Sequence, residues 1–308
     1  MIRKIFAGCV VFCLLPSAAY AEVQKQQESD QQIMDFNLAS FGEKGKKTWD
    51  LSGKSADIFT DVVKLNKVTG NLYGKDEDIK LTADKGDFDK AQSRMHLEQN
   101  VVITTSSGAK LTTDSLDWDR QKSVVATQDK VNIERGNMVT TASGAHGEPS
   151  LKKVSLDKDV TVNINPTQQE NAKKPAAEKR IVITCDGSLQ IDYDKNIATF
   201  NKNVKVDNQE SVIQSDIMDV YFGQTAKDDQ EPKKEKVPSS SGGIMGAASG
   251  SKIDKIVARG HVVITRGENV SYSDEATYNA VDKKITLSGK PKLIIYSQGD
   301  IKNASFGN

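Results

Sequence analysis

The stretch Leu81–Asp89, LTADKGDFD, decides the fold of this chain, because it returns 30 residues later as Leu111–Asp119, LTTDSLDWD. Val101 follows the first copy and Val131 the second, again 30 residues apart, and each begins an alternating segment. A repeat this short, written in alternating apolar and polar residues, is typical of stacked β-hairpins. One hairpin cannot bury its apolar face alone, so we expect the hairpins to stack into two facing sheets.

The alternating pattern covers most of the chain and is interrupted twice by polar, low-complexity sequence. No stretch of any length has the periodicity of an amphipathic helix, so the fold class should be nearly all-β. We therefore divide the chain, after a signal sequence, into a flexible leader (22–45), a first β-unit (46–164), a linker (165–180), a second β-unit (181–300) with a disordered insert (223–252), and a tail (301–308).

Within each unit the strands should be short and separated by turns. Val62–Lys64 and Val68–Leu72 are two such strands, and Asp84–Asp87 and Ser106–Gly108 are typical turn sequences. An Asp recurs once per repeat after a small residue, as at Asp84. We expect its carboxylate to accept hydrogen bonds from backbone amides in an Asx-turn rather than to bind a metal, because these aspartates do not cluster.

The N-terminus has the form of a secretory signal sequence. Residues 3 and 4 are basic, Ile5–Leu15 is apolar, and small residues at Ala19 and Ala21 predict cleavage after Ala21. Cleavage removes two bases and no acid, which leaves 40 basic residues (42 minus 2) against 42 acidic ones, a net charge of −2. This balance argues against nucleic-acid binding. Cys185 is then the single remaining cysteine, so no intramolecular disulfide forms, and we expect a buried structural thiol.

Alternation also assigns side chains to the interior between the two sheets. If the sheets close tightly these residues are core, and if the sheets splay they line a groove for apolar chains; periodicity does not separate the two arrangements. The candidate groove residues are Leu81, Phe88, Leu97, Val101, Ile103, Leu116, Trp118, Val131, Ile133, Ile183, Ile191, Tyr193, Val204, Val206, Val262, Ile264, Tyr278 and Leu287.

The sequence offers little to catalysis. His96, His146 and His261 have no partner at zinc-ligand spacing. We interpret His96 and His261 as strand or surface residues, and we expect His146 to lie in a turn. Neither a nucleophile elbow nor a phosphate-binding glycine loop occurs. Carboxylates such as Asp192 and Asp194 share one strand face, which we expect to be the solvent face. We therefore predict no enzyme activity, no metal and no cofactor.

Particular segments resemble two related families of lipopolysaccharide-transport proteins. Trp49–Gly53, Leu81–Asp89 and Leu97–Val101 resemble the periplasmic domain of the LptC family. Ile253–Val262, Ala276–Tyr278 and Ile285–Pro291 are similar to the LptA/OstA-like bridge proteins. Together the two resemblances cover most of the mature chain, as an LptC-like unit followed by an LptA-like unit.

The resemblance implies two V-shaped β-jellyroll units in tandem in the periplasm, either separate or stacked into one elongated roll. Their apolar groove would carry the acyl chains of lipopolysaccharide. Expected partners are other jellyroll proteins of the transport bridge, an inner-membrane ABC transporter and an outer-membrane translocon. Open rolls have unpaired edge strands, which suit strand-to-strand joining and also head-to-tail self-association. LptC-type proteins usually keep a membrane anchor, whereas this N-terminus looks cleaved, and two units on one chain suggest a fused bridge segment.

Three hypotheses about function follow. The leading one is a non-enzymatic carrier that shields the lipid A acyl chains from water between the two membranes. The alternative is a closed β-solenoid that serves as an envelope scaffold and binds no lipid, and tight packing without a continuous slot would favour it. The third is a β-helical enzyme acting on polysaccharide, which requires carboxylates that converge in a cleft.

Overall fold

The computed structural model describes residues 29–42, 45–74, 77–165, 180–222, 253–279, 281–282 and 284–295. The signal sequence predicted at 1–21, the insert at 223–252 and the tail at 301–308 lie outside these residues, as does the linker except for its two end residues. The elements of the described part are all β-strands, so the predicted all-β jellyroll class is confirmed. No helix in these ranges is long and apolar enough to cross a membrane.

The strands are mostly 11 or 12 residues long, more than twice the predicted length. In chain order they are β1 (Gln31–Phe41), β2 (Lys47–Ile58), β3 (Val62–Tyr73), β4 (Asp78–Asp89), β5 (Arg94–Thr105), β6 (Ala109–Asp119), β7 (Val124–Arg135), β8 (Met138–Gly147), β9 (Lys153–Ile164), β10 (Ile181–Cys185), β11 (Leu189–Asp192), β12 (Ile197–Asp207), β13 (Ser211–Phe222), β14 (Ile253–Arg266), β15 (Asn269–Asn279), β16 (Lys284–Ser288) and β17 (Lys292–Ile294).

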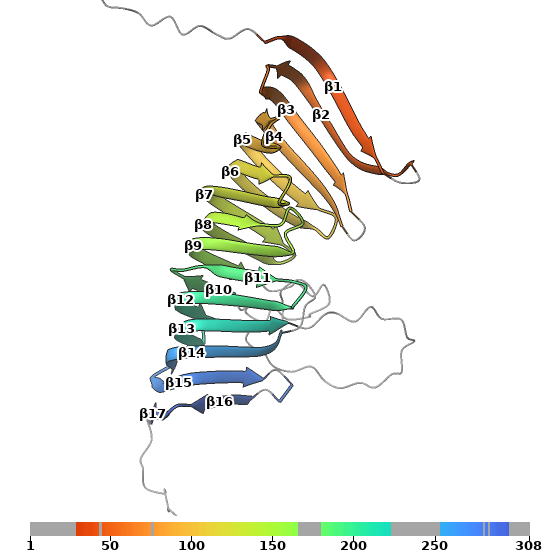
Figure 1. Cartoon of the computed structure of the whole chain (residues 1–308). Coiled ribbons are helices and arrows are strands. Elements are labelled where there is room, and N and C mark those ends of the chain that lie inside the picture. Colours follow the sequence, from red (N-terminus) through yellow and green to blue (C-terminus); the bar gives the residue numbers. More distant parts are fainter. Residues whose placement is uncertain are drawn as a thin grey trace, which may run out of the picture.

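All of these strands belong to one antiparallel sheet of 17 strands, in which strands stack in chain order as far as β15, and β15 pairs with both β16 and β17 (Figure 1). β10 and β11 lie end to end between β9 and β12: Ile181–Cys185 pairs with Val160–Ile164, and Leu189–Asp192 pairs with Lys153–Leu156. They therefore act as one strand interrupted at its middle. The sheet passes from the first predicted unit into the second without a break, so the two units form one elongated roll.

Each long strand bends near its middle, and the bends fold the sheet into two facing layers. In β5, residues 94–97 alternate between exposed and buried, residues 98–100 are all exposed, and residues 101–105 alternate again. Gln99 and Asn100 have left-handed φ angles of 65° and 55°, and the ladder to β6 shifts register there. A bulge of this kind lets both halves of one strand direct apolar side chains to the same interior.

We name the layers by the strand halves that they contain. The first layer contains the halves around Ile79, Ile103 and Val162, and the second layer contains the halves around Phe88 and Leu156. The same division holds along the whole sheet, with β10 in the first layer and β11 in the second. One 30-residue repeat is thus one hairpin whose two strands each cross both layers.

The bend also changes the role expected for the repeated Asp. The stretch Asp84–Asp87 is not a turn but part of β4, where the register of the ladder to β5 shifts. Asp84 accepts hydrogen bonds from Lys67 Nζ and Asn100 Nδ2, both at 2.8 Å, and Asp186 accepts one from Asn203 Nδ2 at 2.7 Å. The prediction that these aspartates cap turn amides is therefore wrong: they hold together the side chains of neighbouring bends.

The Asx-turns use the second acidic position of the repeat, five or six residues further on. The backbone amides of Gln92, Lys122 and Lys195 donate to the carboxylates of Asp89, Asp119 and Asp192 at 2.8, 3.1 and 3.0 Å. The residue that closes each of these turns has a left-handed φ near 53°. Asp at the first position and a small polar residue at the last stabilise this hairpin turn.

The segment expected to be a flexible leader contains the first strand. Residues 31–41 form β1, which pairs with β2 over its full length. Phe36 is buried, and its ring occupies the space where a side chain at Gly53 would lie. The prediction is wrong for these residues because the polar composition of 22–45 hides a short alternating stretch, which the edge of an existing sheet can order.

Candidate functional site

The interior between the two layers is where the candidate groove residues lie. Those with buried side chains are Leu81, Leu97, Val101, Ile103, Leu116, Val131, Ile183, Val204, Val206 and Val262. Those that are half-buried and pack against this core are Phe88, Trp118, Ile133, Ile191, Ile264, Tyr278 and Leu287, while Tyr193 is half-buried at the end of β11. Contact of these residues with lipid stays a prediction.

Most of this interior is a packed core and not an open trough. Leu97, Ile103 and Ile183 have 0% of their surface exposed, and the buried cluster extends from β1 to β15. Side chains packed this closely leave no room for an acyl chain unless the layers move apart. Of the two arrangements that the alternation allowed, the structure therefore has the closed one over most of its length.

A slot with a volume of about 70 Å³ lies between the layers, where the two predicted units meet. We call it the junction slot. Its first-layer side chains are Met138, Thr140, Val162, Ile164 and Ile183, and its second-layer side chains are Leu189, Ile191, Tyr193, Ala198, Phe200, Val220, Phe222 and Ile253. Strands β8–β10 of the first layer thus face strands β11–β14 of the second, so the layers are staggered by several strands. Ile183, Ile191 and Tyr193 are the candidate residues that line it.

Two arginines join the layers at the strand ends. The guanidinium carbon of Arg135, in the first layer, lies 4.1 Å from the ring centroid of Tyr193 in the second. The guanidinium carbon of Arg120, in the second layer, lies 5.5 Å from the ring centroid of Trp49 in the first. Cation–π contacts of this kind stabilise the approach of the two layers. The two contacts hold the layers together at the strand ends, at two places along the roll.

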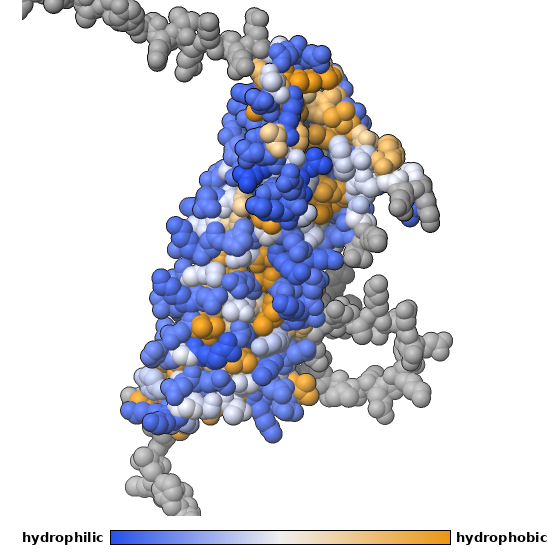
Figure 2. Space-filling model, in the orientation of Figure 1, coloured by the Kyte–Doolittle hydropathy of each residue, from blue (hydrophilic) through white to orange (hydrophobic). Residues whose placement is uncertain are grey.

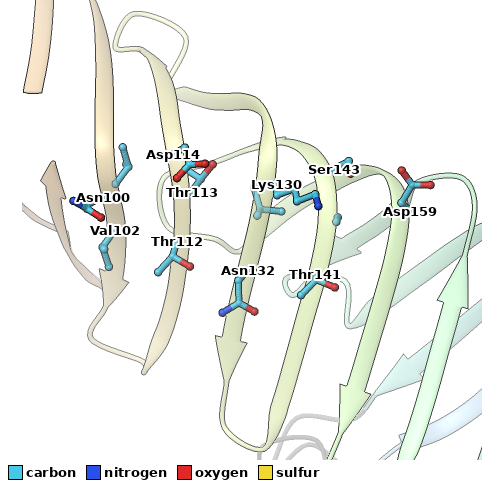
Figure 3. Close-up of a pocket in the computed structure, with 13 residues that line it drawn as sticks. Asn100, Val102, Thr112, Thr113, Asp114, Lys130, Asn132, Thr141, Ser143 and Asp159 are labelled. Atoms are coloured by element: carbon cyan, nitrogen blue, oxygen red, sulfur yellow. The ribbon is translucent and has the colours of Figure 1, made fainter. Parts of the chain in front are cut away.

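A wide hollow lined mostly by residues of polar type lies at the bends of β5–β9 (Figure 3). It has a volume of about 770 Å³, and the ladder between β6 and β7 is interrupted beside it. Figure 3 shows Lys130 between Asp114 and Asp159, all three of which are exposed. Among the described residues no group of three His, Cys, Asp or Glu side chains could hold a metal ion.

Apolar side chains are also exposed at both ends of the roll. On β1 these include Leu38, 55% exposed, and Phe41, 61% exposed, and beyond β15 they include Leu293, 62% exposed. Figure 2 shows apolar surface gathered near β1–β3 and continuing as a narrow, interrupted band down the face in view. Among the described strands β1 pairs with β2 alone, so its outer edge presents unpaired backbone groups.

Each histidine lies beside a carboxylate. His96 Nδ1 is 2.7 Å from Asp117 Oδ1, and this hydrogen bond raises the pKa of His96 above its usual value of 6.5. His261 Nδ1 is 2.8 Å from Asp216 Oδ2, which raises the pKa of His261 in the same way. All three histidine side chains have exposed surface, and His146 lies in β8 and not in the predicted turn. Each histidine is within hydrogen-bond distance of a carboxylate on the neighbouring strand.

Cys185 ends β10 and is buried in the core. Its burial raises the pKa of the thiol to about 11. The Sγ atom lies 3.5 Å from the carbonyl oxygen of Gly187, to which it donates. A thiol that stays protonated and buried is a structural residue, because the thiolate is the reactive form.

Sequence reasoning missed the residues that depend on the stagger of the layers. Arg120 follows β6 and Arg135 ends β7, as many surface arginines do. The residues next to them in the sequence do not predict an aromatic partner from a distant strand. Thr140 lines the junction slot but reads as one polar residue among several in β8. The alternation of β8 was the available signal for Thr140, because residues 140 and 142 have the same parity as Met138.

Two family models match the chain, and together they cover most of it. The family described as LptC, lipopolysaccharide-assembly, LptC-related, matches residues 5–165, which is more than half of the chain. The family described as LptA/(LptD N-terminal domain) LPS transport protein matches residues 183–307. No curated protein matches the chain. The first matched range ends just after β9, and the second begins within β10, which pairs with β9 in the continuous sheet.

Proposed function

Because the chain belongs to the LptC-related lipopolysaccharide-assembly family, we propose that it is a periplasmic carrier that holds lipopolysaccharide acyl chains between its two layers. A role in lipopolysaccharide transport follows from this membership and from the second match, to the LptA/LptD N-terminal transport family. In the proposed role the sugar head group stays in solvent while the protein shields the chains between the inner and the outer membrane. No bond is made or broken.

The observation that carries the proposal is the continuity of the apolar interior. One two-layer roll spans both matched ranges, and its buried cluster runs through the junction between them. Burial of one methylene group yields roughly 0.8 kcal/mol, so several acyl chains bind firmly without any ion pair. A lipid that enters at one end can therefore exchange one apolar contact for the next along the roll.

The closed interior means that lipid must part the layers. The junction slot, at about 70 Å³, has room for only a few methylene groups. Parting costs core contacts, which the entering chain replaces with contacts of its own. The backbone connects the layers at the bends, whereas at the strand ends side-chain contacts such as those of Arg120 and Arg135 hold them, so the strand ends are where the layers separate. Lipid chains then take the place of side chains from the opposite layer.

The exposed strand edges at the two ends of the roll indicate where partner proteins bind. The exposed apolar side chains and free edge of β1 suit the addition of a strand from another jellyroll protein of the bridge. The edge of β16 and β17 suits the same contact at the other end, and the two ends together allow head-to-tail self-association. An inner-membrane ABC transporter supplies the energy for movement, and an outer-membrane translocon receives the lipid.

Photo-crosslinking in cells tests this function. A photoreactive phenylalanine replaces Ile191 or Val206, which face the interior, and in matched controls Gln190 or Lys205, which neighbour them and are exposed. We expect lipopolysaccharide adducts at the two interior positions and not at the two exposed ones. Equal labelling at all four, or none, contradicts the carrier.

The envelope scaffold remains a second candidate because the interior is packed over most of its length. It predicts a different result in the same experiment. Adducts with other protein chains at the exposed positions, and no lipid adduct at Ile191 or Val206, would favour it.

A further inference from the structure

The junction slot contains one side chain that its apolar surroundings do not satisfy. Thr140 is 2% exposed, and its hydroxyl oxygen has no hydrogen-bond partner among the described residues. In the sheet it lies between Ile133 and Val162, and it lines the slot. Buried hydroxyls are nearly always hydrogen-bonded, because leaving one unpaired in an apolar site is unfavourable. A ligand oxygen beside the Thr140 hydroxyl would supply the missing hydrogen-bond partner.

The open side of the slot carries a positive charge. Arg135 stacks on Tyr193, and it also donates a hydrogen bond to Ser107 Oγ at 3.2 Å. Among the described residues no carboxylate lies within ion-pair distance of Arg135. Tyr193 in turn packs against Phe222, with 5.6 Å between the ring centroids, and both rings belong to the slot. The guanidinium thus lies against a ring that lines the slot, and it has no carboxylate partner among the described residues.

Arg135 and Thr140 lie at different depths along the neighbouring strands β7 and β8. Arg135 pairs with Met138 in the ladder between β7 and β8, and Thr140 lies two residues further into the interior. Two residues of a strand span roughly 7 Å. An anionic head group at Arg135 would therefore place the first few carbons of its acyl chain beside the hydroxyl of Thr140. The rest of the chain would meet only carbon.

We propose that the junction slot binds the head end of an acyl chain, with the Thr140 hydroxyl bonded to a chain oxygen and Arg135 paired with an anionic group. The ligand class is an anionic amphiphile whose chain carries a hydroxyl or carbonyl oxygen near its head. Arg135 leaves Tyr193 when the ligand enters, so the same side chain closes the empty slot and anchors the loaded one. This inference rests on the proposed lipid-carrier function and specifies one subsite within it.

Four soluble probes test the subsite on the full chain, each used below its critical micelle concentration. Tetradecanoate and 3-hydroxytetradecanoate differ by one hydroxyl, and dodecyl maltoside and dodecyl phosphate differ in charge. We expect the protein to bind the hydroxylated acid about 3- to 10-fold more tightly than the plain one, which is the range for one added hydrogen bond. Thr140→Val should abolish this preference and leave tetradecanoate binding unchanged.

The matched control for Thr140→Val is Thr113→Val. Thr113 is a buried threonine outside the slot, and its hydroxyl lies 3.4 Å from that of Thr127.

Arg135→Gln should weaken the binding of dodecyl phosphate about 3- to 10-fold relative to the binding of dodecyl maltoside. Arg180→Gln, which removes the same charge from a surface residue bonded to Asn163, should leave that ratio unchanged.

The outcomes separate the subsite from the function. A hydroxyl preference that survives Thr140→Val, or a phosphate ratio that Arg135→Gln does not alter, overturns the subsite. Binding of all four probes without any preference also overturns the subsite and leaves the carrier function standing. Failure of every probe to bind overturns both.

Discussion

Arg120 and Trp49 belong to opposite layers of the roll and to strands far apart in the sheet, yet the guanidinium carbon lies 5.5 Å from the ring centroid. Arg120 follows β6, and Trp49 lies near the start of β2. The same guanidinium lies 5.9 Å from the ring of Trp118 in its own layer. One side chain thus holds aromatic residues of both layers together, and the contact exists because the layers are staggered.

Replacement of Arg120 should therefore loosen the roll at its N-terminal half. We expect Arg120→Ala to lower the free energy of unfolding by about 0.5–2 kcal/mol, the range for one to several cation–π contacts. Urea denaturation followed by tryptophan fluorescence measures it. Lys122→Ala, in the same turn with a side chain that is 70% exposed, should change stability by less than about 0.5 kcal/mol. Equal effects of the two variants would show that Arg120 does not join the layers.

Cys185 should be inert in the folded protein. With its pKa raised to about 11, roughly one thiol in a thousand is ionised near pH 8, and burial hides it from reagents. We expect labelling by a thiol reagent to be at least about 100-fold slower in the native protein than in urea. Labelling at the rate of a free cysteine would mean that β10 opens readily from the sheet.

The two matched regions should unfold together. Trp49 and Trp118 report on the first region, and exposure of Cys185 reports on the second. Because the sheet is continuous and the first layer of β8–β10 faces the second layer of β11–β14, we expect both probes to give one urea midpoint. Leu156→Ala, in the fully buried centre of β9, should lower both midpoints equally and cost about 2–5 kcal/mol. Two separate midpoints would establish two independent domains.

The repeat in the sequence was sufficient to predict the fold class and the interior face of most strands. Alternation works within each half of a strand, because side chains of one parity point to one side. It fails at the bend, where Gln99 and Asn100 adopt left-handed φ angles without any glycine to mark them. Two short strands, Val62–Lys64 and Val68–Leu72, were therefore expected where β3 runs as one bent strand, and a turn was expected at Asp84–Asp87, where β4 continues through its bend.

The stagger of the layers lies beyond what a repeat can predict. It is set by the bends and the twist summed over many strands, and no local pattern records it. The contact of Arg135 with Tyr193 and the slot around Thr140 both depend on it, since their second-layer partners lie in β11–β14. Residues of this kind become visible only when strands distant in the chain are brought face to face.

His96 should titrate above its usual value of 6.5, because Asp117 accepts a hydrogen bond from the protonated ring at 2.7 Å. Glu98 adds to the effect from 3.1 Å, while partial burial opposes it. NMR titration of the imidazole signals measures this pKa. Asp117→Asn should lower the pKa of His96 and leave that of His261 unchanged, since His261 pairs with Asp216. A pKa of His96 that does not respond to Asp117→Asn would contradict the pair.

The same pair should make stability depend on pH in a defined direction. A raised pKa in the folded state means that the ion pair stabilises the protein fully below about pH 6.5, where the unfolded chain is also protonated. This contribution is lost as the pH rises through the higher pKa of the folded state. The difference in unfolding free energy between the unmodified protein and Asp117→Asn should therefore be larger near about pH 6 than near about pH 8.5. Because the pair is largely exposed, added salt should reduce the difference at the lower pH, whereas a difference that grows with pH would contradict the assignment.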